Sequence, residues 1–192
     1  PKRNVTVNKT NKSISPMKHL YLKACIVGIM LAAASLIQAE TQPRPEYPHP
    51  QFERTEWLNL NGTWNYTFDF SGTGDQKDWA KAKSFDGKIT VPFCPESKLS
   101  GVAFTDFIPC IWYQRSITVP DGWRGQNILL HFGASDYETA VYIDGRHVET
   151  HYGTGSSFAM DITSFVQAGK TANLVVRVRD DLRKGLQPGG KQ

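Results

Sequence analysis

The stretch Trp64-Asn65-Tyr66-Thr67-Phe68-Asp69-Phe70 carries an aromatic residue at every second position. Successive side chains of a β-strand point to opposite faces, so this alternation puts four aromatic rings on one face of a strand. The turn-forming residues Asn59-Leu60-Asn61-Gly62 stand directly before it. We therefore expect a strand here, with its aromatic face in a hydrophobic core.

Segments of the same alternating polarity continue to residue 181, with turn signals between them and no helix-length periodic segment. A two-residue hairpin is expected at Asp144-Gly145. The spacing of about seven short strands predicts an all-β fold, a jelly-roll β-sandwich. Beyond the first strand, the expected strands are 89–91, 111–119, 128–132, 139–144 with 146–148, 158–160 and 174–179.

The distribution of charge argues against a nucleic-acid-binding protein. The 192 residues carry a net charge of +4, but six of the 22 basic residues precede Glu40, whereas all 18 acidic residues lie after residue 39. The remainder has 16 basic and 18 acidic residues, a net charge of −2. A mildly acidic body lacks the basic surface that binds phosphates, so no nucleic-acid partner is expected.

The basic amino-terminal segment resembles a secretory signal peptide. Met17 begins it, Lys18 and Lys23 follow, and an apolar run covers residues 24–37. The alternative is a membrane-spanning helix, but this run is shorter than the roughly 18 to 20 residues that a span needs. We expect a signal peptide at 17–39 and a periplasmic or secreted protein, with membrane contact only during export. Residues 1–16 precede the start methionine and are left unassigned.

The rest of the chain divides into a short lead and one domain. Residues 40–51 are rich in proline and are expected to run extended. Residues 52–192 form the domain. Its last expected strand, 174–179, is followed by a Gly- and Pro-rich loop that ends at Gln192, where a sandwich would normally need a further strand to cover its edge. The sequence therefore indicates a fragment, truncated before the last strand of the sandwich.

The cysteines and histidines indicate no cofactor and no metal site. An exported protein meets an oxidising compartment, in which Cys94 and Cys110 could form a disulfide or remain packed thiols, and we favour packed thiols. Cys25 lies in the signal peptide. The five histidines are scattered, without a partner at metal-ligand spacing.

Five motifs in order give the domain a family resemblance. They resemble the amino-terminal sugar-binding domain of glycoside hydrolase family 2, the family of β-galactosidases and β-glucuronidases. The resemblance covers nearly all of residues 52–192. The motifs are Leu58 to Trp64, Thr90 to Ser97, Ile111 to Arg115, Val141 to Gly145 and Asp161 to Thr163.

This resemblance implies a galactose-binding-like jelly roll, followed in family members by an immunoglobulin-like sandwich and a (β/α)8 barrel. The barrel carries two glutamates that act as nucleophile and acid/base in retaining hydrolysis of an O-glycosidic bond. No residue of this chain matches them, so we assign no catalytic residue and expect this chain alone to be inactive. Its expected partners are a carbohydrate substrate and the two further domains of the parent enzyme.

The loop after the last expected strand contains the candidate substrate-binding residues. Carboxylates of Asp180 and Asp181 could accept hydrogen bonds from sugar hydroxyls, with Arg183 positioning them. In family members this loop runs into a closing strand with a Gly-Ile-Trp-type signature, and acidic residues close to that signature can reach the mouth of the active site. This sequence ends at Gln192, before such a signature. The alternative, which loops of this composition favour, is that these residues only cap and solvate a turn.

Two functions without catalysis remain open. A free-standing carbohydrate-binding module would need exposed aromatic rings on which a sugar stacks, and Trp79, Trp123 and Tyr152 are the candidates. A structural or adhesion domain would need a complete sheet with closed edges.

Overall fold

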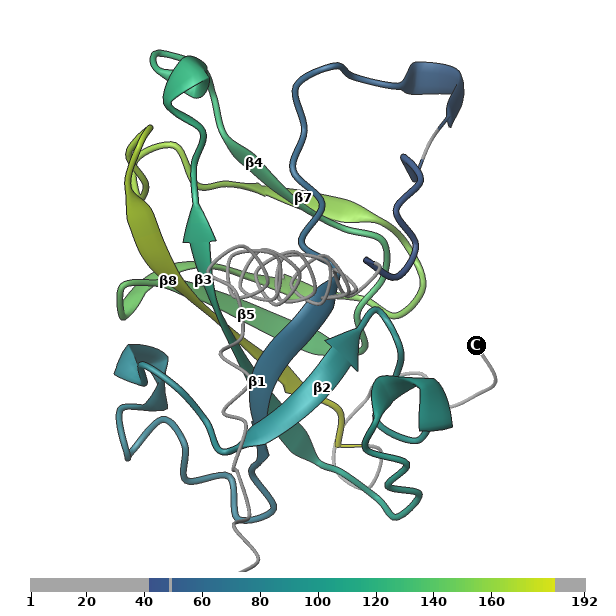
Figure 1. The fold of residues 1–192 in the computed structure, drawn as a ribbon. Coiled ribbons are helices and arrows are strands. Elements are labelled where there is room, and N and C mark those ends of the chain that lie inside the picture. The colour runs from purple at the N-terminus through teal and green to yellow at the C-terminus, as the bar shows by residue number, and fades with distance from the viewer. Residues whose placement is uncertain (1–41, 49, 182–192) are drawn as a thin grey trace, which may run out of the picture. The chain divides into compact units, whose positions relative to one another are not determined.

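The computed structural model describes residues 42–48 and 50–181, and the regular secondary structure within them consists of β-strands and four short 3-10 helices (Figure 1). The unassigned segment 1–16, the expected signal peptide 17–39 and Arg183 lie outside the described residues. The strands are β1 (Gly62–Phe68), β2 (Gly87–Val91), β3 (Cys110–Thr118), β4 (Leu129–Phe132), β5 (Glu138–Ile143), β6 (Arg146–Tyr152), β7 (Phe158–Asp161) and β8 (Thr171–Arg179). Short 3-10 helices cover Pro50–Phe52, Trp79–Lys81, Lys98–Ser100 and Asp121–Trp123.

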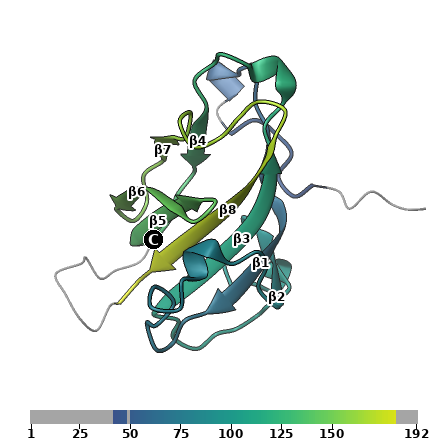
Figure 2. The same cartoon turned by 90° about the vertical axis from the view of Figure 1, so that its left-hand side faces the viewer.

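The strands form two antiparallel sheets, which confirms the predicted all-β sandwich. The larger sheet has the order β2-β1-β3-β8-β5-β6, and the smaller one pairs β4 with β7. Figure 2 shows β3 and β8 side by side in the middle of the larger sheet. These two strands pair along nine residues, from Cys110 opposite Arg179 to Thr118 opposite Thr171. These two long strands fix the positions of the loops at both ends of the sheet.

The main core lies between the two sheets. It takes alternate residues from the large sheet and Leu130 and Met160 from the small one, as the period of two requires. Burying each such side chain stabilises the fold by about 1.5–3 kcal/mol. The large-sheet members of this core include Trp64, Ile89, Ile117, Val141, Ile143, Leu174 and Val176.

The aromatic face of β1 is buried only in part. Trp64 lies in the main core, and Tyr66 and Phe68 are partly buried. The expectation that Phe70 also lies in the core is wrong, because the strand ends at Phe68 and Phe70 is 57% exposed. The chain leaves the sheet at Asp69, whose carboxylate accepts the backbone N–H of Thr73 (2.9 Å) and of Gly74 (2.8 Å).

A second, smaller core covers the other face of the large sheet. Cys110, Trp112 and Val175 are buried there beneath the connection between β1 and β2, which contributes Trp79 and Phe85. The ring of Trp79 meets Trp112 edge-on, with the centroids 6.0 Å apart. Both faces of the central strands are therefore buried.

The predicted hairpin at Asp144-Gly145 is confirmed. It joins β5 to β6, and both turn residues have positive φ, 50° and 78°. These are the conformations of a type I′ turn, in which a glycine carries no steric cost. The strand after the turn continues to Tyr152, beyond the expected end at residue 148.

The two cysteines of the domain are free thiols. Cys110 is buried in the second core, as expected of a packed thiol. Cys94 is exposed instead, because it lies in the loop after β2. The alternative of a disulfide between them is not formed.

Candidate functional site

Two of the three residues predicted from the loop after the last strand lie directly beyond β8. The backbone N–H of Asp180 donates to the carbonyl oxygen of Pro109 at 3.0 Å, which fastens this end of β8 to the start of β3. Asp181 follows and is partly buried. Arg183, the third residue, lies outside the described residues, so its position relative to them stays a prediction.

A third carboxylate, not predicted from the sequence, lies near Asp180. Asp136 precedes β5, and its Oδ1 is buried without a hydrogen-bond partner among the described residues. Burial of the carboxyl group and the nearby Asp180 raise the pKa of Asp136 above its ordinary value. The peptide between Asp136 and Tyr137 is cis. The site thus holds an aspartate with unused hydrogen-bonding capacity.

Two tyrosines stand beside these carboxylates. The backbone N–H of Tyr137 donates to the Arg179 carbonyl oxygen at 3.2 Å, which holds Tyr137 against the end of β8. Tyr152, at the end of β6, is 61% exposed, and its ring centroid lies 6.1 Å from that of Tyr137. An exposed ring can stack on the apolar face of a ligand, while neighbouring carboxylates accept hydrogen bonds from its hydroxyl groups.

An ionic cluster centred on the buried Arg177 supports this end of β8. The guanidinium of Arg177, a residue that is 9% exposed, donates to the carboxylates of both Asp75 and Glu138. Arg179 lies 3.6 Å from Asp75 and 4.0 Å from Glu138. These contacts tie β8 to β5 and to the connection between β1 and β2, so the strand end beneath Asp180 is held in place.

The structure separates the three aromatic residues predicted as sugar-stacking candidates. Trp79 packs against Trp112 in the second core and is not free to bind a ligand. Trp123 is partly buried, and its indole N–H donates to Glu56 Oε2 at 2.7 Å. Only Tyr152, of the three, lies with the carboxylates at the end of β8.

Residues 42–48 and 50–181 contain neither a metal-binding cluster nor a membrane-spanning helix. No group of three or more His, Cys, Asp or Glu side chains is arranged there to hold a metal ion. The same ranges contain no helix that is long and apolar enough to span a membrane.

The comparison with protein families decides what these residues belong to. The model of "Glycosyl hydrolases family 2, sugar binding domain" matches residues 57–186, more than half of the chain. The chain belongs to glycosyl hydrolase family 2. The match includes all eight described strands and Asp136, Tyr152, Asp180 and Asp181. The family resemblance carried by the five motifs is thereby confirmed.

Curated relatives agree with the family 2 assignment. The chain is 28% identical over 158 residues to a β-glucuronidase of Felis catus, a match that covers 75% of this chain and 24% of that protein. It is 26% identical over 137 residues to a β-glucuronidase of Paenibacillus borealis, covering 71% of this chain and 23% of the relative. A β-galactosidase of Thermoanaerobacter pseudethanolicus matches 80 residues at 30% identity, or 41% of this chain and 11% of the relative.

Solved structures show the same fold for this family 2 domain. A β-glucuronidase of Lactobacillus rhamnosus is 27% identical with a TM-score of 0.58, and the match covers 65% of this chain and 21% of that one. A β-glucuronidase of Ruminococcus gnavus in complex with uronic deoxynojirimycin has the same TM-score at 24% identity, covering 66% and 22%. The chain spans about a quarter of the length of the relatives that it matches.

Proposed function

We propose that this chain is the amino-terminal sugar-binding domain of a retaining glycoside hydrolase that acts on β-linked glucuronides. The observation that carries this proposal is the family match over residues 57–186, combined with relatives that are named β-glucuronidases. Hydrolysis of β-galactosides is the second candidate. It is supported by the β-galactosidase that is 30% identical over 80 residues.

The chemistry of bond cleavage would reside in the rest of the parent enzyme. Retaining glycosidases need a nucleophilic carboxylate about 5–5.5 Å from an acid/base carboxylate. Two glutamates of this chain already have structural partners, since Glu138 binds Arg177 and Glu56 accepts the indole N–H of Trp123. We therefore assign the two catalytic glutamates to the barrel and a binding role to this domain.

The end of β8 would contact the hydroxyl groups of the substrate. Asp136, Asp180 and Asp181 supply carboxylate oxygens that accept hydrogen bonds, and Tyr152 offers an aromatic face. Arg183 would position these carboxylates. Like charges repel, so this acidic group disfavours the carboxylate of a glucuronide. The uronate group is accordingly expected to bind outside this domain, with the sugar hydroxyls or the leaving group at the end of β8.

The parent enzyme would pack this domain against an immunoglobulin-like domain and a barrel of the same chain.

We also propose that the parent enzyme is exported, with residues 17–39 as the signal peptide, and that it works in the periplasm or outside the cell. The support is the arrangement of Lys18, Lys23 and the apolar run 24–37. Amino-terminal sequencing of the mature protein from the periplasm or the culture medium tests this proposal. A protein that retains residues 17–39 contradicts it.

The test of the activity uses the complete parent enzyme with p-nitrophenyl β-D-glucuronide and p-nitrophenyl β-D-galactoside. We expect hydrolysis of the glucuronide.

The binding role of Asp180 is tested in the same enzyme. We expect Asp180→Asn to raise KM about fivefold to tenfold with a smaller effect on kcat, because the side chain binds substrate without taking part in the bond-breaking step. Asp86→Asn is the matched control, since Asp86 is exposed on the connection between β1 and β2. If neither substrate is hydrolysed, the proposed activity is wrong; if the variants at 180 and 86 behave alike, the binding role of Asp180 is wrong.

A further inference from the structure

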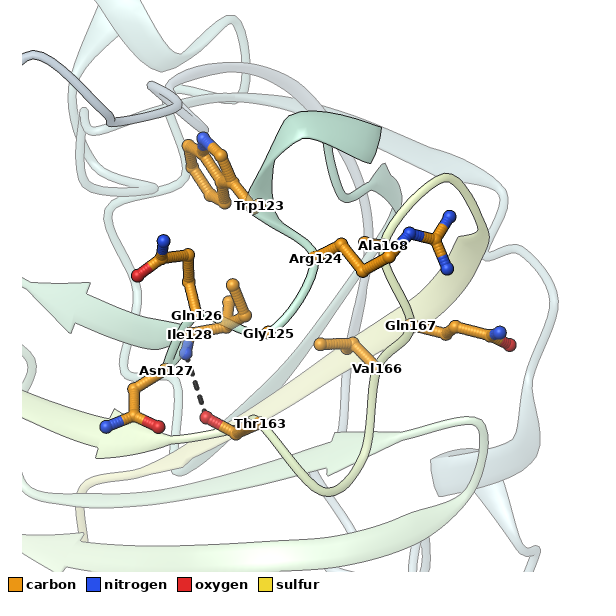
Figure 3. A pocket seen from close by; sticks show the side chains of 10 residues that line it. All are labelled: Trp123, Arg124, Gly125, Gln126, Asn127, Ile128, Thr163, Val166, Gln167 and Ala168. Carbon is orange, nitrogen blue, oxygen red and sulfur yellow. Dashed lines mark hydrogen bonds between the residues drawn. The ribbon is translucent and has the colours of Figure 1, made fainter.

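A pocket lies at the opposite end of β8 from Asp180, and we propose that it binds a neutral pyranose unit. Two loops form it: residues 123–128 between β3 and β4, and Thr163 with residues 166–168 before β8 (Figure 3). Its volume is about 280 Å³. In Figure 2 the segment 121–123 lies beside the start of β8, away from the end that Asp180 follows.

The walls of this pocket are fixed by hydrogen bonds between the two loops. The backbone N–H of Ile128 donates to Thr163 Oγ1 at 2.8 Å, and the N–H of Ile162 donates to the Ile128 carbonyl oxygen at 2.9 Å. Where the two loops meet the large sheet, between the end of β3 and the start of β8, the backbone N–H of Gly169 donates to the carbonyl oxygen of Val119 at 2.9 Å. A pocket whose walls are already ordered loses little entropy when it binds a small ligand.

The lining combines an indole with apolar and amide groups. Trp123 stands at the rim of the pocket in Figure 3, and its bond to Glu56 keeps the ring in place. Ile128 and Val166 supply apolar surface. Within the described ranges, the side-chain amides of Gln126 and Asn127 make no hydrogen bond to protein, so both are free to bind a ligand. Aromatic and apolar surface beside donors and acceptors suits a pyranose, which has C–H faces and a ring of hydroxyl groups.

The charges around the pocket favour a neutral sugar over an anion. Arg124 is its only charged lining residue, and it forms an ion pair with Asp121. In Figure 3 the guanidinium of Arg124 points away from Trp123. A uronate or phosphate group would have to compete with Asp121 for this one lining cation, whereas a neutral hexose needs none.

Size and position define what this site would do. Pockets for drug-sized ligands measure roughly 300–1,000 Å³, so a smaller pocket suits a single sugar ring. Nine residues of β8 separate the pocket from Asp180, a span of about 30 Å at the usual rise per residue. A sugar unit bound in the pocket therefore lies too far from Asp180 to be the same unit that Asp180 would contact. The site would instead hold another unit of a glycan, which goes beyond the proposed function and does not depend on it.

The test is saturation-transfer NMR on the 192-residue chain with methyl β-D-glucopyranoside, methyl β-D-galactopyranoside and methyl β-D-glucuronide as probes. We expect weak binding of at least one neutral probe and no stronger binding of the glucuronide. Trp123→Ala and Gln126→Ala should each reduce the neutral-probe signal at least fivefold. Trp57→Ala is the matched control, because Trp57 is also partly buried but packs on Tyr47 outside the pocket.

The possible outcomes separate this site from the one at the end of β8. Circular dichroism confirms that each variant is folded, and Gln126→Ala gives the answer if Trp123→Ala does not fold, because Gln126 is exposed. The proposal is overturned if no neutral probe binds, or if Trp123→Ala and Gln126→Ala retain the full signal. A signal that Asp180→Asn removes and these two variants leave intact belongs to the end of β8 and also overturns it.

Discussion

The carboxylate of Asp69 accepts the indole N–H of Trp112 at 3.2 Å and thereby joins the connection after β1 to the centre of the large sheet. The same Oδ2 atom accepts the backbone N–H of Gly74 at 2.8 Å, and Oδ1 accepts that of Thr73. Asp69 is 2% exposed. The Asp69 carboxylate therefore holds this connection over the second core. Trp112, a member of that core, is fully buried beneath the connection.

We expect Asp69→Ala to lower the free energy of unfolding by about 3 kcal/mol, because three donors, two of them in buried hydrogen bonds, lose their acceptor. The measurement is urea unfolding of the 192-residue chain followed by tryptophan fluorescence. Asp86→Ala serves as the control, since Asp86 is an exposed aspartate of the same connection. An equal effect of the two substitutions would show that the Asp69 hydrogen bonds do not stabilise the second core.

Arg177→Met is expected to lower the free energy of unfolding by about 2 to 3 kcal/mol, because it leaves the partly buried Glu138 without its main partner. Arg179→Met is the comparison. Arg179 is more exposed and its distances to Asp75 and Glu138 are 3.6 and 4.0 Å, so its loss should cost under about 1 kcal/mol. Thermal unfolding of both variants shows which substitution destabilises the fold more. If Arg179→Met is the more damaging, the assignment of Arg177 as the centre of the cluster fails.

The alternation of apolar residues was sufficient to predict the sandwich, but it describes one face of a sheet at a time. Asp69 alternates with the aromatic residues of β1, so the pattern places it on the other face, away from the core. That face is covered by a connection with no periodicity of its own, which brings Trp79 and Phe85 over Trp112. Such long-range coverage leaves no local signal, and this is why the second core was not predicted. Phe70 was placed wrongly for a different reason: the alternation continues through it, but β1 ends at Phe68.

The candidate site shows the same limit. Asp180 and Asp181 were found because they follow the last strong strand. Asp136 was missed because it lies 44 positions earlier in an ordinary loop. The two ends meet only because β5 pairs with β8 in the register that sets Glu138 opposite Arg179. Register between distant strands depends on the whole sheet, and a single sequence does not reveal it.

Burial raises the pKa of the Cys110 thiol from 9.0 to about 11, with a smaller contribution from Asp69. The thiol should therefore stay protonated and unreactive at pH 8, while the exposed Cys94 is alkylated by iodoacetamide. Peptide mapping by mass spectrometry distinguishes the two, with urea-unfolded protein as the control. Because the folded-state pKa is the higher one, the contribution of Cys110 to stability is complete below pH 9 and declines toward pH 11. Rapid modification of Cys110 in the folded chain would contradict this prediction.

Asp136→Asn is expected to stabilise the folded chain at pH 7. The pKa of Asp136 is raised by burial and by Asp180, so folding favours its protonated form. A raised folded-state pKa means that this group stabilises the fold below its unfolded pKa, about 3.9, and that the contribution is lost as the pH rises through the folded value. Asparagine is close in shape and carries no charge at any pH, so it avoids the cost of ionising the buried Oδ1.

The measurement is urea unfolding of the wild-type chain and Asp136→Asn at pH 7 and at about pH 3.5, near the unfolded pKa. The variant should be more stable at pH 7, and the difference should shrink at the lower pH, where both side chains are neutral. Asp180→Asn should lower the pKa of Asp136 in a carboxyl NMR titration, because it removes the neighbouring charge. If Asp136→Asn is instead less stable at pH 7, the carboxylate has a stabilising partner in the folded chain. A stabilised variant with weaker substrate binding in the parent enzyme would show that Asp136 is kept for function at a cost in stability.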